Sequence, residues 1–279
     1  MQKMNEKTLK VHQSKEGVLE ISLNRPKVRN ALNNTLIADL TSIFKKNANL
    51  QGVRVVILRG EGNVFCAGGD LNWMKNSIGL SYEENLQETR NLTQMFRLIN
   101  ECSKPVIGAV HGAAIGGGVG LVSVCDIVIA TKETLFSLSE VKLGLIPACI
   151  GPFIIEKIGT SFARELFMSA ERFKAPKANR IGLLHHVVED LAELNTKAAE
   201  ITANILNSGP KALEAAKTLL HFLSWPEQRA GCKDCFEYSA KMLADLRVSE
   251  EGQEGVKSFL EKRPPTWQKF TGVEKNSII

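Results

Sequence analysis

Two glycine-rich turns and one glutamate are the residues of this chain whose types and spacing could support catalysis. A glycine triplet at 116–118 follows an apolar run at 105–110, and an earlier turn at 65–70 follows the apolar run 53–59. Glycine lets the chain turn sharply and lets a ligand approach closely, so each turn can present a backbone N–H to the same oxygen atom. Two such donors, together with one acid or base such as Glu140, are the minimum set that stabilises an enolate.

Glu140 is the candidate for proton transfer. Its neighbours Leu138, Val141 and Leu143 are apolar, so burial of the carboxyl group would raise its pKa toward the working range. An alternative interpretation is an ordinary glutamate at the start of a helix, where the helix dipole favours a carboxylate. The residues alone favour the two interpretations equally.

The composition indicates a globular protein with one large core and an appendage. The chain has 279 residues, of which 44% are hydrophobic, and its formal net charge is +5; a domain holds roughly 150 residues. The six cysteines are scattered, mostly in apolar runs, which predicts free thiols rather than disulfides or a metal site. Residues 1–10 are polar and charged and lack the apolar centre of a signal peptide, so we expect a cytoplasmic protein.

Three other classes of function are disfavoured. The apolar stretch 105–130 is interrupted by His111, the glycine triplet and Asp126, so we expect buried strands and a turn rather than a membrane span. No Gly-Lys-Ser or Gly-Lys-Thr occurs in the sequence, which excludes a phosphate-binding loop of that type. Lysines and arginines are dispersed and aromatic residues make up only 6% of the chain. RNA binding is therefore a minor alternative, and no nucleic-acid partner is expected.

The hydrophobic periodicity predicts a βα core followed by a helical tail. Expected strands lie at 17–24, 53–59, 105–110 and 127–130, and expected helices at 35–48 and 83–100. This alternation favours an α/β fold with a mainly parallel sheet. Beyond residue 163 the strand pattern nearly disappears, and helices are expected at 191–206, 210–223 and 227–246. We therefore divide the chain into a core, 1–200, and a helical tail, 201–279.

Several motifs, in a fixed order, carry a resemblance to a known family. They are LNRPKVRNAL at 23–32, FCAGGD at 65–70, the glycine triplet with its flanks, SLSEVKLGLIP at 137–147 and FLEKR at 259–263. On these motifs the chain resembles the crotonase superfamily of enoyl-CoA hydratases and isomerases. The resemblance implies a crotonase-like spiral of repeated ββα units, with a C-terminal helical domain that takes part in oligomerisation. It also implies homotrimers, often paired into hexamers, an acyl-CoA thioester as the partner, and no cofactor besides the coenzyme A of the substrate.

The same resemblance assigns roles to individual residues. It implies Gly69 and Gly117 as backbone N–H donors to the thioester oxygen, and Glu140 as the residue that transfers protons. Contacts with the coenzyme A and thioester portions of the substrate are implied for Lys27, Val28, Arg29, Ala67, Gly68, Asp70, Leu71, Phe259 and Lys262. The last two belong to the tail and would complete a nucleotide site.

One position departs from the two-glutamate pattern of typical hydratases. The other glutamate of that pattern would lie two residues beyond the glycine triplet, where this chain has Gly120. Either Glu140 acts alone or another group contributes, and His111, Glu83 and Glu84 are candidates between which spacing does not choose. Gly120 would leave space for a water molecule, which favours hydration over the alternative, a Δ3,Δ2-enoyl-CoA isomerase.

The segments 70–74 and 138–150 are similar to those of bacterial methylglutaconyl-CoA hydratases, which also tend to carry glycine at the position of Gly120. The narrower hypothesis is therefore hydration of 3-methylglutaconyl-CoA in leucine degradation. Because that substrate has a second carboxylate, we expect a cationic or donor-rich acyl pocket.

Overall fold

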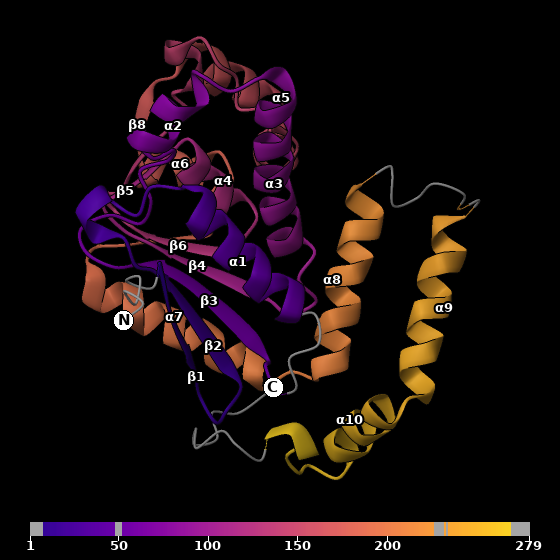
Figure 1. The fold of residues 1–279 in the computed structure, drawn as a ribbon. Helices are drawn as coiled ribbons and strands as arrows, with labels where there is room; N and C mark the ends of the chain where they lie inside the picture. The colour runs from indigo at the N-terminus through magenta and orange to yellow at the C-terminus, as the bar shows by residue number, and fades with distance from the viewer. Residues whose placement is uncertain (1–7, 48–51, 226–231, 233, 269–279) are drawn as a thin grey trace, which may run out of the picture.

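The structure is a computed structural model that describes residues 8–47, 52–225, 232 and 234–268. Its body is built around two β-sheets, and the C-terminal helices extend from one end of that body (Figure 1). None of the described helices is long and apolar enough to cross a membrane.

The main sheet has the strand order β1-β2-β3-β4-β6-β9. β1 (Leu9–Gln13) and β2 (Val18–Leu23) are antiparallel. The other neighbours are parallel, as expected, and comprise β3 (Val55–Gly60), β4 (Val106–Val110), β6 (Ile127–Thr131) and β9 (His186–Val188). The four strands predicted from periodicity are all present, whereas β1 was not predicted.

Both faces of the main sheet are covered by helices. Successive side chains of a strand point to opposite faces, and in β3 the side chains of Val56 and Leu58 enter the core on the side of α1 (Asn34–Asn47) and α3 (Tyr82–Asn100). The intervening Val55 and Ile57 pack with apolar side chains of α7 (Leu191–Leu206). A strand buried on both faces must be apolar throughout, which is why β3 and β4 form continuous hydrophobic runs in the sequence.

A second, smaller sheet has the order β5-β7-β8 and consists of the short strands β5 (Ala113–Ile115), β7 (Leu135–Ser137) and β8 (Arg172–Lys174). Successive units of the chain place one strand in each sheet and then form a helix. One unit is β4, β5 and α4 (Gly117–Ser123); the next is β6, β7 and α5 (Gly151–Ser169), with the short 3-10 helix η2 (Glu140–Leu143) between β7 and α5. The spiral of ββα units is therefore confirmed.

The remaining helices connect these units or form the tail. They are η1 (Pro26–Val28), α2 (Leu71–Ser77), α6 (Ala175–Arg180), α8 (Pro210–Ser224), α9 (Cys235–Val248), α10 (Glu250–Leu260) and η4 (Thr266–Gln268). The expected helix at 227–246 begins at residues outside the described ranges, and within them α9 starts at Cys235.

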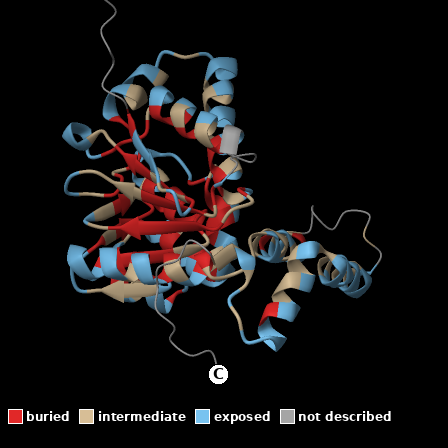
Figure 2. Cartoon of the chain, turned by 90° about the horizontal axis from the view of Figure 1, so that it is seen from below, coloured by how far each residue is buried: buried red, intermediate tan, exposed pale blue. Residues whose placement is uncertain are grey.

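The tail stands off the body and buries little of its own surface. Most residues of α8–α10 are exposed or half-buried (Figure 2), and α9 has no buried residue. An ion pair of 2.7 Å between Lys217 of α8 and Asp126 anchors the tail to the body. The expected boundary at residue 200 lies inside α7, which packs on the main sheet as far as Leu206. The helical tail therefore starts after α7.

Candidate active site

The two glycine turns lie side by side because backbone hydrogen bonds join them. The N–H of Cys66 donates to the carbonyl of Ala113 (3.1 Å), and the N–H of Ile115 donates to the carbonyl of Cys66 (3.0 Å). Gly68 has a φ of +91°, and a β-carbon built on it would lie 2.7 Å from the carbonyl oxygen of Ile115 and 3.8 Å from the backbone nitrogen of Gly117. A left-handed position as crowded as this one requires glycine.

The N–H groups of Gly69 and Gly117 are unused donors of these turns. Neither donates a hydrogen bond to an acceptor within the described ranges, whereas the adjacent N–H groups of Asp70 and Gly116 donate to backbone carbonyls. Gly117 is also the first residue of α4, and the first N–H groups of a helix have no partner inside it. Both N–H groups therefore meet the requirement for donating to an oxygen of a bound ligand.

Asp70 holds the first turn in place. Its side chain is buried, and Oδ1 accepts hydrogen bonds from the N–H groups of Asn72 (2.9 Å) and Trp73 (3.4 Å) at the start of α2. Its other oxygen, Oδ2, forms an ion pair of 2.8 Å with Nη2 of Arg25. Burial raises the pKa of Asp70, but Arg25 and the two N–H groups outweigh this effect, and the net pKa is lowered. Asp70 thus joins the start of α2, next to Gly69, to Arg25, and its expected contact with the substrate stays a prediction.

Apolar side chains of α2 cover the first turn. A β-carbon built on Gly69 would lie 3.5 Å from Sδ of Met74 and 3.9 Å from the ring of Trp73. The indole N–H of Trp73 donates to Oε2 of Glu88 (2.8 Å), which fixes the ring. Leu71 begins the same helix with its side chain 82% exposed, as a substrate contact requires. This surface beside the first donor suits an acyl chain or a pantetheine arm.

Glu140 lies beside the glycine triplet, as the first residue of η2. Its Oε1 would be 3.0 Å from a β-carbon built on Gly116. A residue with a side chain at position 116 would therefore crowd the carboxyl group. Its Oε2 is buried and has no hydrogen-bond partner among the described residues. Burial raises the pKa of Glu140, and the residue's own backbone N–H opposes this only in part. The predicted rise in pKa is confirmed, although Glu140 is half-buried and, of the apolar neighbours that the prediction used, Leu138 is buried while Val141 and Leu143 are exposed. A carboxyl group with a raised pKa is suited to accept and return protons.

The space that we expected beside Gly120 is filled. A β-carbon built on Gly120 would lie 2.3 Å from Cγ2 of Ile150 and 2.9 Å from ring atoms of Phe96. All three residues are buried. The expectation of a water site next to Gly120 is therefore wrong, because the side chains of Ile150 and Phe96 already fill the space beside its α-carbon. A glutamate at 120 would not fit without moving them.

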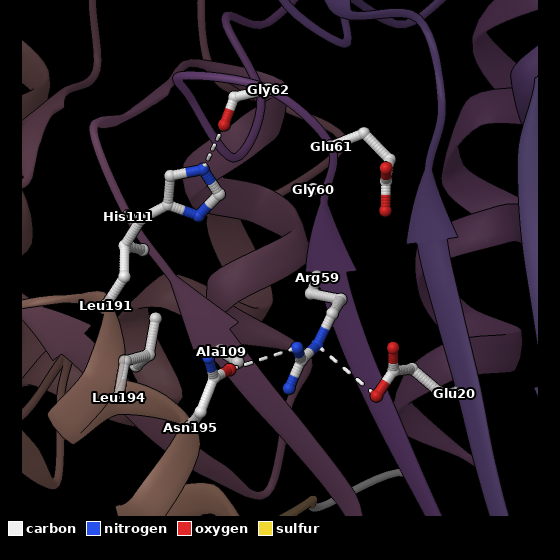
Figure 3. Close-up of a pocket in the computed structure, with 10 residues that line it drawn as sticks. All are labelled: Glu20, Arg59, Gly60, Glu61, Gly62, Ala109, His111, Leu191, Leu194 and Asn195. Atoms are coloured by element: carbon white, nitrogen blue, oxygen red, sulfur yellow. Dashed lines mark hydrogen bonds and ion pairs between the residues drawn. The ribbon is translucent and has the colours of Figure 1, made fainter.

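His111, one candidate for the missing second group, lines a different cavity. Its Nε2 is 2.8 Å from the carbonyl oxygen of Gly62, so this nitrogen carries the proton. Figure 3 shows the imidazole in a cavity with Arg59 of β3 and Asn195 of α7, which are joined by a hydrogen bond of 3.1 Å. Glu140 does not line this cavity.

Glu83 and Glu84 do not replace the missing group either. Oε2 of Glu84 accepts a hydrogen bond from the N–H of Ser81 (2.8 Å) and closes a capping box at the start of α3. Glu83 lies exposed in the same first turn. No charged side chain in the described part of the chain shifts the pKa of Glu140. Glu140 therefore lacks a second ionisable partner there.

The loop with Lys27, Val28 and Arg29 lies against the first glycine turn, as a coenzyme A site would require. The N–H of Ala67 donates to the carbonyl of Arg29 (3.0 Å), so the two segments run together. The side chains of Lys27, Val28 and Arg29 are exposed, and Ala67 is half-buried between this loop and Gly68. The structure thus brings the expected residues of both segments to one surface.

Arg25 and Asn30 hold this loop, and neither was singled out from the sequence. The buried side chain of Asn30 accepts a hydrogen bond from the N–H of Arg25 (2.8 Å) and donates to the carbonyls of Glu61 (2.8 Å) and Val64 (2.9 Å). Its φ of +55° lies in the left-handed region, which asparagine adopts more readily than most residues. Both residues belong to the LNRPKVRNAL motif, and their place in that motif is the feature of the sequence that could have identified them.

Phe259 and Lys262 lie at the end of α10, far from the glycine turns of the same chain. Phe259 is 75% exposed. In Figure 1, α10 lies at the opposite end of the molecule from α2 and α4. Within one chain, the structure therefore does not bring these two residues to the loop of Lys27.

The chain matches the enoyl-CoA hydratase/isomerase family over residues 13–270. The crystal structure of an enoyl-CoA hydratase from Shewanella pealeana is similar to it, with 33% identity, a TM-score of 0.87, and coverage of 95% of this chain and 97% of that one. The 2,3-dehydroadipyl-CoA hydratase of Escherichia coli strain K12 is 32% identical over 256 residues, which are 91% of this chain and 96% of that protein.

Isomerases of the family are similar as well. The mitochondrial Δ(3,5)-Δ(2,4)-dienoyl-CoA isomerase of Dictyostelium discoideum is 31% identical over 263 residues, which are 90% of this chain and 87% of that protein. Together with the ββα spiral and the paired glycine turns, these matches show that the chain belongs to the enoyl-CoA hydratase/isomerase family of the crotonase superfamily.

Proposed function

We propose that this protein is an enoyl-CoA hydratase that adds water across the α,β double bond of an enoyl-CoA thioester. The observation that carries the proposal is the placement of the half-buried Glu140, whose Oε2 is buried and has no hydrogen-bond partner in the described part of the chain, beside the second of two joined turns. The N–H groups of Gly69 and Gly117 in these turns have no acceptor among the described residues. Such a site supplies the two elements that enolate chemistry needs, oxyanion donors and one proton carrier.

In the proposed reaction the thioester oxygen accepts hydrogen bonds from Gly69 and Gly117. Water attacks Cβ while Glu140 takes one of its protons, and the electron pair of the double bond moves toward the thioester oxygen. Glu140, now protonated, returns a proton to Cα, so that water is added in full and the carboxylate is restored. The raised pKa of Glu140 supports this cycle, because a carboxyl group that gains and loses a proton near neutral pH works best when its pKa is above the ordinary value.

The absence of a second carboxylate at Gly120 makes isomerisation the principal alternative. An isomerase would use Glu140 to move a proton from Cα to Cγ and would keep water out. Because Ile150 and Phe96 fill the space at Gly120, the expected water site no longer favours hydration. The preference for hydratase now rests on the relatives named as hydratases, in Escherichia coli and Shewanella pealeana.

For the acyl group we propose a dicarboxylic enoyl-CoA, with 3-methylglutaconyl-CoA as the first candidate. The similar Escherichia coli protein is named for 2,3-dehydroadipyl-CoA, whose acyl group also ends in a second carboxylate. The resemblance of the segments 70–74 and 138–150 to methylglutaconyl-CoA hydratases supports the branched candidate.

For the coenzyme A end we propose that Lys27, Val28 and Arg29 contact the nucleotide of the substrate. Because Phe259 and Lys262 lie far from this loop in one chain, we propose that they reach it from a neighbouring subunit of a homotrimer, or of a dimer of trimers. Lys27→Gln and Arg29→Gln should then raise KM more than they lower kcat.

The proposed function is tested by offering the purified protein crotonyl-CoA, 3-methylglutaconyl-CoA and a trans-3-enoyl-CoA under matched conditions. Hydration of the conjugated esters supports the hydratase, and a tenfold higher kcat/KM for 3-methylglutaconyl-CoA, about 1.4 kcal/mol, supports the narrower substrate. Conversion of the 3-enoyl ester alone would overturn the proposal in favour of an isomerase.

A further inference from the structure

A lysine binds the far end of the helix that begins at the proposed donor Gly117. The ammonium group of Lys157, on α5, donates hydrogen bonds to the carbonyl oxygens of Val122 (3.3 Å) and Cys125. Val122 lies in the last turn of α4, and Cys125 follows the end of that helix. Lys157 thus caps the opposite end of α4 from Gly117.

Helix α4 needs such support because of its composition and its burial. Its short sequence, GGVGLVS, contains three glycines, and glycine is the poorest helix former after proline. Residues 118–123 are all buried, so water does not satisfy the carbonyl groups at the end of the helix. Local side chains serve two of them: Ser123 Oγ donates to Gly120 (2.8 Å) and Cys125 Sγ donates to Leu121 (3.2 Å).

The carbonyl of Cys125 is served by Lys157, which also binds the carbonyl of Val122. No carboxylate within the described ranges forms an ion pair with Lys157, whereas the buried Lys217 pairs with Asp126 at 2.7 Å. Lys157 is therefore committed to the end of α4 rather than to an acidic partner.

The same part of α5 also touches the middle of α4. Ile150, the residue before α5, contacts Gly120, and Phe153 and Ile154 are buried in the same core. Ile150 ends the loop that starts at Glu140, so the start of α5 connects the proton carrier with the donor helix. Of these contacts, only those of Lys157 are hydrogen bonds to carbonyl groups at the C-terminal end of α4.

We propose that Lys157 is a positioning residue for the oxyanion site: by binding the carbonyl groups at the end of α4, it fixes the helix and with it the N–H of Gly117. The inference rests on the proposed function of Gly117. It predicts that the loss of Lys157 weakens stabilisation of the transition state while leaving the binding of coenzyme A nearly unchanged, because the lysine lies behind the helix and not at the nucleotide.

The test compares Lys157→Gln and Lys157→Arg with the wild type and with Lys132→Gln, in which a lysine of an exposed ion pair with Glu189 is changed. Three quantities are measured: kcat and KM for an enoyl-CoA, amide hydrogen exchange at 113–125, and the absorption of a bound, chromophoric conjugated acyl-CoA. The absorption of such a probe shifts to the red when its carbonyl accepts strong hydrogen bonds, so it reports on the donors directly.

The proposal predicts that Lys157→Gln lowers kcat at least tenfold, changes KM less than threefold, reduces the red shift of the probe and accelerates exchange at 113–125. Lys157→Arg, which keeps a charged donor, should recover most of the kcat and of the red shift. Lys132→Gln should match the wild type in all three measurements.

A wild-type red shift and a kcat within twofold in Lys157→Gln would overturn the proposal. Accelerated exchange throughout the main sheet would overturn it as well, because Lys157 would then serve general stability rather than α4. If the wild type converts no enoyl-CoA, the proposed function fails, but the exchange and absorption measurements still decide whether Lys157 positions α4.

Discussion

The replacement Glu140→Gln should lower kcat without lowering the stability of the fold, so it distinguishes a catalytic role of Glu140 from a structural one. Glutamine has the shape of glutamate but cannot take a proton from water, so the proton transfers lose their carrier. A positioned general acid–base contributes about 10²–10⁴-fold to turnover, which corresponds to about 3–5 kcal/mol in the activation barrier. We expect kcat to fall by that factor, and KM for the acyl-CoA to change little, because Glu140 lies at the glycine turns and not at the Lys27 loop.

The same replacement should not destabilise the fold. Burial raises the pKa of Glu140 above its value in the unfolded chain, so the charged form is disfavoured in the native state and opposes folding at pH values above that pKa. Because glutamine carries no charge, the Tm of Glu140→Gln should equal or exceed that of the wild type near neutral pH. A loss of activity together with a retained or raised Tm identifies a functional carboxylate.

The assay follows hydration of crotonyl-CoA by loss of its conjugated absorption, with the Tm measured on the same preparations. Glu83→Gln is the matched control, because Glu83 is exposed in the first turn of α3 and should be replaceable within twofold in kcat. A kcat of Glu140→Gln within a few-fold of the wild type would refute the assignment of Glu140. A large fall in Tm would refute the electrostatic argument.

Three further predictions follow from individual residues. Because the carboxylate form of Glu140 accepts the proton and its pKa is raised, kcat/KM should increase with pH through a value above the ordinary range of glutamate; a pH profile of the wild type with no such rise would contradict this. Gly120→Ala should lower the free energy of unfolding by about 1–3 kcal/mol, because its β-carbon would meet Ile150 at 2.3 Å. Denaturant titration measures this, with Gly79→Ala as the control because nothing lies near that position. Equal stability of the two variants would show that the core adapts to the added methyl group. Asp70→Asn keeps a helix cap but leaves Arg25 without its charged partner, so stability should fall by about 3 kcal/mol or more and kcat should fall with it; an unchanged kcat in the folded variant would mean that Gly69 does not depend on this ion pair.

The sequence was sufficient to predict the long, regular elements. The apolar spacing of α7 predicted its bounds as the structure has them, and β3 and β4 were evident as continuous apolar runs. The strands β5, β7 and β8 are too short to show an alternating pattern, so the second sheet was expected only from the resemblance. The glycine turns were visible because an unusual local conformation requires an unusual residue.

What could not be predicted depended on residues distant in the sequence. Whether Gly120 leaves a cavity is decided by Ile150, thirty positions away, and Phe96 on another helix. Whether Asp70 faces a ligand is decided by Arg25, whose guanidinium reaches it from a different loop. The raised pKa of Glu140 was predicted from its apolar neighbours in sequence, of which the structure buries Leu138 but leaves Val141 and Leu143 exposed. Its place beside Gly116 is compatible with catalysis, while its position as the first residue of η2 is also that of the alternative interpretation.

The most direct test of hydration at Glu140 follows the oxygen of water into the product. The wild type and Glu140→Gln are incubated with crotonyl-CoA or 3-methylglutaconyl-CoA in water enriched in oxygen-18, and the acyl-CoA products are analysed by mass spectrometry. With the wild type we expect a 3-hydroxyacyl-CoA that carries the heavy oxygen on Cβ, and in Glu140→Gln we expect its formation to be slowed by about 10²–10⁴-fold. A wild-type product that contains no heavy oxygen and has only a shifted double bond would contradict it.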